Sequence, residues 1–136
     1  MPQMIFVNLP AKDLDATKAF WTKLGFSFNP QFSDESTGCL VISDTIYSML
    51  LSEEKFRSFT APGKEISDAT KSTEVLITLS RDSREAVDEL VDAALAAGGS
   101  AAKEPQDHGF MYGRSFADLD GHHWEVFWMD PAAVQG

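Results

Sequence analysis

The stretch that decides the fold is residues 74–99, EVLITLSRDSREAVDELVDAALAAGG. Its beginning, Glu74 to Leu79, is a strand-sized apolar run, and the residues after it carry apolar side chains at helical spacing. Asp82, with Glu85 three residues further on, predicts the start of this helix, and Gly98-Gly99 predicts its end. The stretch therefore reads as a strand followed by an amphipathic helix.

The same order of elements occurs earlier in the chain. Met4 to Leu9 reads as a strand that stops at Pro10, Asp13 predicts a helix cap, and Gly25 predicts the end of that helix. Three strand-sized segments follow each helix: Phe26 to Phe32, Cys39 to Ser43 and Ile46 to Leu51, then Ser100 to Lys103, Gly113 to Ala117 and His122 to Met129. The sequence therefore predicts an α+β fold made of two βαβββ modules.

The module boundaries follow from this repeat. We expect a first module over residues 1–51, a linker over 52–73, a second module over 74–130 and a tail over 131–136. The linker is mostly polar, with room for a short helix. One helix covers only one face of each sheet, so the other face has to be covered by the partner half, a second chain or a ligand. A concave interior of ligand size is the expected outcome.

Composition excludes several classes of function. The chain has 11 basic and 21 acidic residues and a net charge of −10, which disfavours binding to nucleic acid or to anionic lipid. No apolar run has the length of a membrane span, and the N-terminus does not resemble a signal peptide. The single cysteine, Cys39, cannot form an internal disulfide, which fits a reducing compartment. We therefore expect a cytoplasmic protein without a nucleic-acid or membrane partner.

Two segments carry a family resemblance. Residues 8–15 (NLPAKDLD), followed by Ala19-Phe20-Trp21 and Leu24-Gly25-Phe26, resemble the opening of vicinal-oxygen-chelate proteins, the glyoxalase, bleomycin-resistance and extradiol-dioxygenase superfamily. Residues 116–125 (FADLDGHHWE) resemble its closing motif. The chain is most similar to the branch labelled predicted lactoylglutathione lyase. This resemblance implies paired βαβββ modules that form a concave mixed sheet with helices on the outside, a site in that sheet, and a homodimer.

In metal-using members of the family, four strand residues, normally His, Glu or Gln, hold Ni, Zn, Fe or Mn. The two halves of the repeat align at Leu9 with Leu79 and at Asp44 with Asp120. The four ligand positions then fall on Phe6, Met49, Leu76 and Glu125. Only Glu125 can bind a hard or borderline divalent ion, whereas a catalytic site needs about three protein ligands. The sequence therefore predicts no metal and no cofactor, and it disfavours glyoxalase I activity and extradiol ring cleavage.

Glu125 is the candidate catalytic residue. Strand alternation places His123, Glu125 and Phe127 on one face, and the tryptophan-rich opposite face suits packing under a helix. A carboxylate in an apolar cavity is expected to have a raised pKa and to serve as a general acid or base. Alternatively it pairs with an Arg or Tyr, or is hydrated. His123 and Glu125 could share a metal only if Asn8 or His108 joined them.

A glycine-flanked loop supplies further candidates. Tyr112, Arg114 and Phe116 share a strand face, and Arg114 could hold a carboxylate of a substrate or of Glu125, or simply lie at the surface. Asn8 could offer its amide to a ligand or bond a neighbouring backbone group. The predicted ligand-binding residues are Phe6, Asn8, Met49, Leu76, His108, Tyr112, Arg114, His123 and Glu125.

These features rank three functions. The first is metal-independent binding of a small organic molecule in an apolar cavity. The second is an enzyme that uses Glu125 as a metal-free acid or base beside a carbonyl. The third is a lactoylglutathione-lyase-like or dioxygenase-like enzyme with a displaced metal site. The sequence leaves enzymatic activity open, and an enzyme on this scaffold is expected to be a glyoxalase-related lyase.

Overall fold

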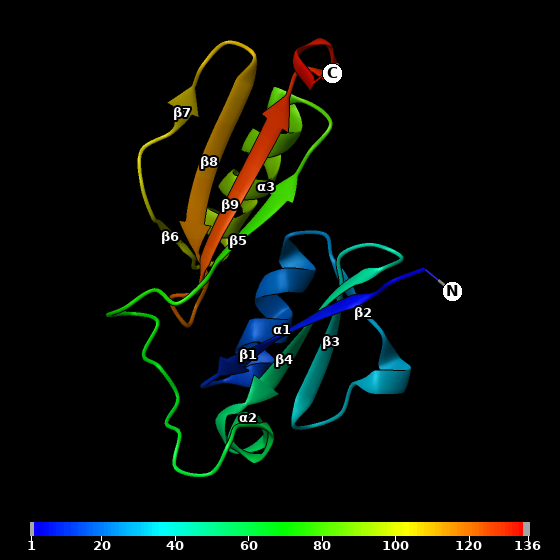
Figure 1. Ribbon diagram of the computed structural model, residues 1–136, viewed down its shortest axis with the longest axis vertical. Helices are drawn as coiled ribbons and strands as arrows, with labels where there is room; N and C mark the ends of the chain where they lie inside the picture. Colours follow the sequence, from blue (N-terminus) through cyan, green and yellow to red (C-terminus); the bar gives the residue numbers. More distant parts are fainter. Residues whose placement is uncertain (1, 135–136) are drawn as a thin grey trace. The chain divides into compact units, whose positions relative to one another are not determined.

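The computed structural model describes residues 2–134, and the chain divides between Ser67 and Asp68 into two compact units. Unit 1 contains β1 (Ile5–Ala11), α1 (Leu14–Lys23), β2 (Ser27–Phe28), a 3₁₀ helix (Pro30–Phe32), β3 (Thr37–Val41), β4 (Ile46–Ser52) and α2 (Glu53–Phe59). Unit 2 contains β5 (Leu76–Ser80), α3 (Arg84–Ala96), β6 (Ser100–Ala101), β7 (Gln106–Asp107), β8 (Met111–Ala117), β9 (His123–Met129) and a 3₁₀ helix (Pro131–Val134). Both units place one helix after their first strand, as the repeat predicts (Figure 1).

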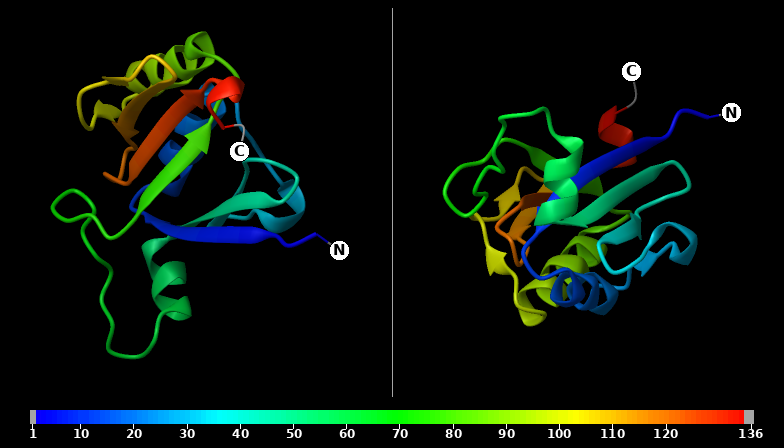
Figure 2. Two further views of the ribbon diagram at one scale, coloured as in Figure 1. Left: turned by 45° about the horizontal axis from the view of Figure 1, so that its top comes forward. Right: turned by 90° about the horizontal axis from the view of Figure 1, so that it is seen from below.

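Each unit has its own mixed sheet. In unit 1 the strand order is β1-β4-β3-β2, with β1 parallel to β4 and the other pairs antiparallel. In unit 2 the order is β5-β9-β8-β6, with β5 parallel to β9, and β7 pairs with β8 as well. The two parallel pairs, β1 with β4 and β5 with β9, can be followed in the left view of Figure 2. The α+β fold with two similar halves is therefore confirmed, and β7 is an addition that the sequence pattern did not predict.

The helix of unit 2 covers one face of its sheet. The apolar stripe of α3 is buried, and Trp124 and Val126 of β9 are fully buried beneath it. The alternate residues of β9, His123 and Glu125, point away from the helix and are partly exposed. The predicted split of β9 into a helix-facing side and an open side is confirmed.

In unit 1, α1 begins and ends where the sequence predicts. The Asp13 carboxylate accepts a hydrogen bond from the Ala16 backbone N–H at 3.1 Å, which satisfies one of the free donors of the first turn. Gly25, with φ +96°, ends the helix in the left-handed conformation that glycine adopts without strain. Phe20 and Trp21 are buried between α1 and the sheet.

Several predicted boundaries are wrong, and three of them have a clear local cause. β1 continues through Pro10. In the described part of the chain β1 pairs only with β4, and such an edge strand tolerates a residue without a backbone donor. The strand predicted over 26–32 is shorter, because Asn29 caps a 3₁₀ helix that starts at Pro30. The cap of α3 is Ser83 and not Asp82: the Ser83 hydroxyl accepts a hydrogen bond from the Ala86 N–H at 3.0 Å.

Among residues 2–134, no helix combines the length and the apolar character that crossing a membrane requires.

Candidate functional site

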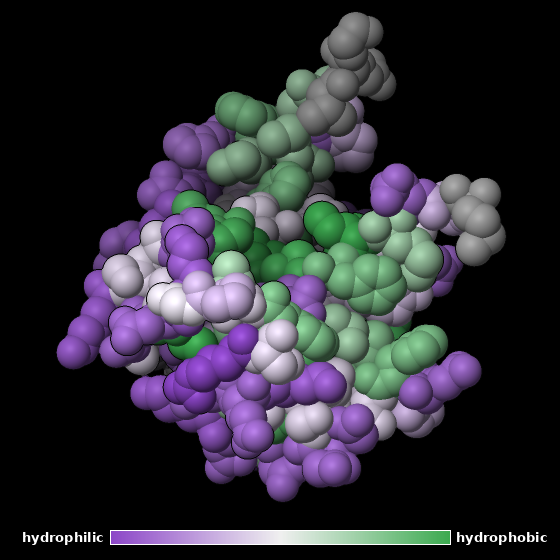
Figure 3. Space-filling model, turned by 60° about the horizontal axis from the view of Figure 1, so that its bottom comes forward, coloured by the Kyte–Doolittle hydropathy of each residue, from purple (hydrophilic) through white to green (hydrophobic). Residues whose placement is uncertain are grey.

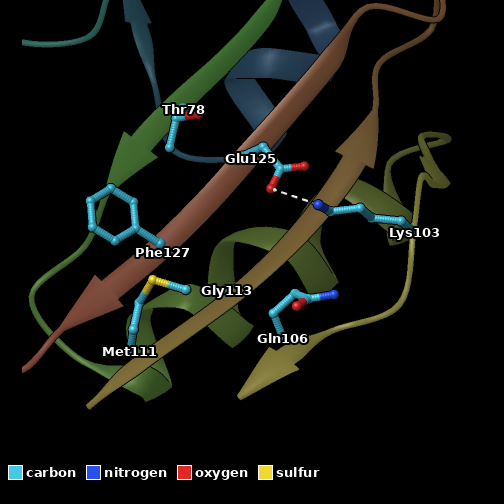
Figure 4. A pocket seen from close by; sticks show the side chains of 7 residues that line it. All are labelled: Thr78, Lys103, Gln106, Met111, Gly113, Glu125 and Phe127. Carbon is cyan, nitrogen blue, oxygen red and sulfur yellow. Dashed lines mark ion pairs between the residues drawn. The ribbon is translucent and has the colours of Figure 1, made fainter. Parts of the chain in front are cut away.

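A hollow of about 410 Å³ lies on the open face of the unit 2 sheet, the face that α3 does not cover (Figure 4). Its lining residues are Thr78, Lys103, Gln106, Met111, Gly113, Glu125 and Phe127. The strand registers explain why these side chains meet, because Thr78 lies opposite Glu125, and Phe127 lies opposite Gly113. Residues paired across neighbouring strands project to the same face of a sheet.

Glu125 and Lys103 form the polar end of the hollow. Oε2 of Glu125 contacts Nε2 of His123, and Oε1 lies 3.6 Å from Nζ of Lys103. That second distance is longer than a hydrogen bond, and the Lys103 side chain is 51% exposed, so the ion pair contributes little to stability. Oε1 and the ammonium group therefore remain available to a bound molecule.

Met111, Gly113 and Phe127 form the apolar end. A β-carbon on Gly113 would lie 3.6 Å from the Val126 carbonyl oxygen and 3.8 Å from Cβ of Phe127, which are ordinary contact distances. The backbone would therefore accept a larger residue at this position. Glycine here leaves open volume above the sheet, beside the side chain of Met111 (Figure 4).

Residues 102–110 carry Lys103 and Gln106 and are fixed to the rest of unit 2. The Arg84 guanidinium donates two hydrogen bonds of 2.9 Å to the Asp107 carboxylate and a third to the Gly109 carbonyl oxygen. These bonds hold the pKa of Asp107 down to about 2. The Lys103 N–H donates to the buried Ser115 hydroxyl at 3.1 Å. The backbone is thus anchored on both sides of the two side chains that reach the hollow.

Two predicted ligand-binding residues of unit 2 lie on the other face of the sheet. The Tyr112 hydroxyl donates to Asp88 at 2.7 Å, and the Arg114 guanidinium donates to Asp88 and Asp92 at 2.9 Å, both of which belong to α3. The Tyr112 hydrogen bond, supported by Arg114, lowers the pKa of Asp88. The suggested pairing of Arg114 with Glu125 is therefore wrong.

The other predicted residues of unit 2 are placed differently. His123 adjoins the polar end through its contact with Glu125. Leu76 lies opposite His123 on the same face and is 58% exposed. His108 stands in an exposed loop, where its ring stacks on Phe110 at a centroid distance of 6.2 Å, and it does not line the hollow.

The three predicted residues of unit 1 lie on β1 and β4. The Phe6 ring stacks on Tyr47 with centroids 5.0 Å apart, yet Phe6 remains 47% exposed. The Asn8 amide donates to the Phe6 carbonyl oxygen at 3.3 Å, so its amide nitrogen bonds the backbone, one of the two predicted outcomes. Met49 lies opposite Asn8. Phe6 belongs to the exposed apolar side chains of the molecule, and Figure 3 shows one face on which hydrophobic side chains reach the surface among polar ones.

The residues at the family's ligand positions do not fit a resident divalent ion. The strand registers support the alignment of the two halves, because Asn8 lies opposite Met49 in unit 1 just as Thr78 lies opposite Glu125 in unit 2. The alignment places the four ligand positions on Phe6, Met49, Leu76 and Glu125. Together they offer one carboxylate, one thioether and two hydrocarbon groups, which is too few hard donors for Ni, Zn, Fe or Mn. Within residues 2–134, one group of three side chains lies close enough together to hold a metal ion: Asp118, Asp120 and His122. Glu125 does not belong to this group.

Most of the residues that line the hollow were not among those predicted from the sequence. Thr78 and Met111 could have been found by extending the alternation from Leu76 and along β8, because period 2 fixes which residues share a face. Lys103 and Gln106 gave no such signal. Lys103 lies outside the strands and Gln106 in the two-residue strand β7, which is held in part by the distant contact between Arg84 and Asp107.

The fold and the site together define an α+β protein of two βαβββ halves with a small-molecule-sized hollow on an open sheet. The chain belongs to the Glyoxalase/Bleomycin resistance protein/Dioxygenase superfamily, whose family model matches residues 3–126. No curated protein matches the chain at a significant level.

Solved structures agree with this assignment. The chain is similar to a hypothetical protein from S. aureus, with 32% sequence identity over 94% of this chain and 95% of that one, and a TM-score of 0.76. A glyoxalase/bleomycin resistance protein/dioxygenase family enzyme from Burkholderia phytofirmans has 22% identity over 94% and 99% of the two chains, with a TM-score of 0.78. A bleomycin resistance determinant encoded on the transposon Tn5 has 19% identity over 95% and 99%, with a TM-score of 0.63. The last two share the fold.

Proposed function

We propose that unit 2 binds a small organic molecule in the hollow above its sheet, without a resident metal. The observation that carries the proposal is a hollow of about 410 Å³ with an apolar end at Met111 and Phe127 and a few polar groups around Glu125. Apolar walls with a small number of placed polar groups are typical of small-molecule sites. The apolar end supplies affinity, and the polar end orients the ligand.

A larger side chain on the sheet beneath the hollow tests this function. Gly113→Val is expected to weaken binding of the uncharged fluorescent probe N-phenyl-1-naphthylamine by about tenfold or more, because the new side chain occupies the ligand volume. The free energy of unfolding should change by less than about 1 kcal/mol, since the added Cβ meets ordinary contacts and valine suits a strand. Probe fluorescence gives the affinity, and urea denaturation gives the stability.

The control is Ala96→Val at the exposed end of α3, which also creates a valine side chain, by adding two methyl carbons away from the hollow. It should leave probe binding unchanged. Unchanged binding to Gly113→Val, or no binding to the unmodified protein, would contradict the proposed site.

A second function is favoured by the contact of His123 with Oε2 of Glu125. A carboxylate held by an imidazole and facing a ligand hollow can take a proton from a carbon beside a carbonyl group and return it, which requires no metal. Glu125→Gln is expected to abolish turnover of such a substrate while leaving the fold intact. Unchanged turnover by this variant would exclude the function.

The homodimer and the cytoplasmic location that the sequence predicts stay predictions. Light scattering of the purified protein would test the dimer.

A further inference from the structure

The polar groups of the hollow are not satisfied by the protein itself. Within residues 2–134, the Thr78 hydroxyl, the Gln106 side-chain amide and the Lys103 ammonium group make no hydrogen bond to other protein groups. Oε1 of Glu125 has only the ammonium group at 3.6 Å. A strong acceptor and a strong donor therefore stand side by side, joined by one long ion pair that leaves each with hydrogen-bonding capacity for a ligand (Figure 4).

The charges of these two groups restrict the ligand. A carboxylate ligand would be attracted by Lys103 but repelled by Glu125. An ammonium ligand would be attracted by Glu125 but repelled by Lys103. The Glu125 side chain is only 22% exposed, so a ligand head beside it loses water and must replace those hydrogen bonds. A neutral head with an N–H directed at Glu125 and a C=O directed at Lys103 satisfies both groups.

We propose that the ligand of the hollow carries an uncharged head with adjacent hydrogen-bond donor and acceptor, as in a primary carboxamide, on an apolar body. This inference rests on the proposed binding function and specifies its ligand class. The apolar body lies over Gly113 beside Met111 and Phe127, and the head bridges Oε1 of Glu125 and Nζ of Lys103 from the open side of that pair.

Three ligands with one apolar body and different heads test the inference: 4-phenylbutanamide, 4-phenylbutanoate and 4-phenylbutylamine. Affinities are measured by titration in ¹H–¹⁵N correlation spectra, which also show whether the Gly113 and Phe127 amides shift. The unmodified protein should bind the amide about tenfold more tightly than either charged ligand, because each charged head leaves one polar group of the site unpaired.

Removing the charge of Glu125 or of Lys103 should change the order of affinity of the three ligands. In Glu125→Gln the remaining Lys103 should make the carboxylate the tightest of the three, and in Lys103→Met the remaining Glu125 should favour the amine. The matched controls Glu89→Gln and Lys71→Met remove the same charges at exposed positions outside the hollow and should preserve the order of the unmodified protein.

The outcomes separate this inference from the proposed function. The inference of a neutral head is overturned if either charged ligand binds the unmodified protein as tightly as the amide or more tightly. It is also overturned if the order of the three affinities is unchanged in both Glu125→Gln and Lys103→Met. If N-phenyl-1-naphthylamine binds in the hollow and none of the three ligands does, the inference fails and the binding function stands. If no probe binds there, both fail.

Discussion

Replacing Asp118 with alanine is expected to lower the free energy of unfolding by about 3–5 kcal/mol. Asp118 follows β8 and is 6% exposed. One carboxylate oxygen accepts hydrogen bonds of 3.0 Å from the backbone N–H groups of Asp120 and His122, and the other accepts one of 3.0 Å from the Trp124 indole. Alanine leaves three donors without this acceptor at a cost of about 1–3 kcal/mol each, partly offset where water can enter.

Asp118→Asn is the matched variant, because it keeps the shape and one acceptor oxygen. That oxygen can still serve the two backbone donors, whereas the new NH₂ group faces the Trp124 indole N–H, donor against donor. We expect a loss of about 1–2 kcal/mol, measured by urea denaturation with circular dichroism and tryptophan fluorescence. A loss for alanine no greater than for asparagine would show that the hydrogen bonds do not hold this turn.

The pH dependence of stability gives a second readout on the same residue. Burial raises the pKa of Asp118, and this outweighs the opposing effects of His122 and of the donated hydrogen bonds. The folded chain therefore holds the proton at a pH where the unfolded chain has released it. The associated stability is complete below the unfolded pKa, about 3.9, and is lost as the pH rises through the raised native value. Asp118→Asn should remove this component of the pH profile.

Much of the fold follows from local patterns. The repeated strand-helix order, the Asp13 cap and the glycine helix ends depend on residues close together in the chain, and all are present in the structure. The orientation of Glu125 was equally predictable, because alternation on β9 separates it from the bulky residues Trp124 and Val126 that a helix has to cover.

The site needed tertiary information. Alternation correctly placed Tyr112 and Arg114 on one face of β8, but a strand pattern does not say which face the helix covers. Because Tyr112 and Arg114 are polar, the sequence suggested that they face a ligand. In the structure both donate hydrogen bonds to Asp88 of α3, on the face that the helix covers. Likewise, Lys103 reaches the hollow because Arg84 holds Asp107, a contact between residues 23 positions apart.

Phe20→Ala is expected to destabilise the protein by about 3–5 kcal/mol, because it empties the place where α1 meets its sheet. Phe20 is 1% exposed and packs edge-to-face on Trp21 with ring centroids 5.5 Å apart. Phe20→Leu retains most of the volume and should cost below about 1.5 kcal/mol. Phe59→Ala, on a ring that is 61% exposed, should cost below about 1 kcal/mol. Urea denaturation orders the three variants, and an equal loss for Phe59→Ala and Phe20→Ala would contradict a core built around α1.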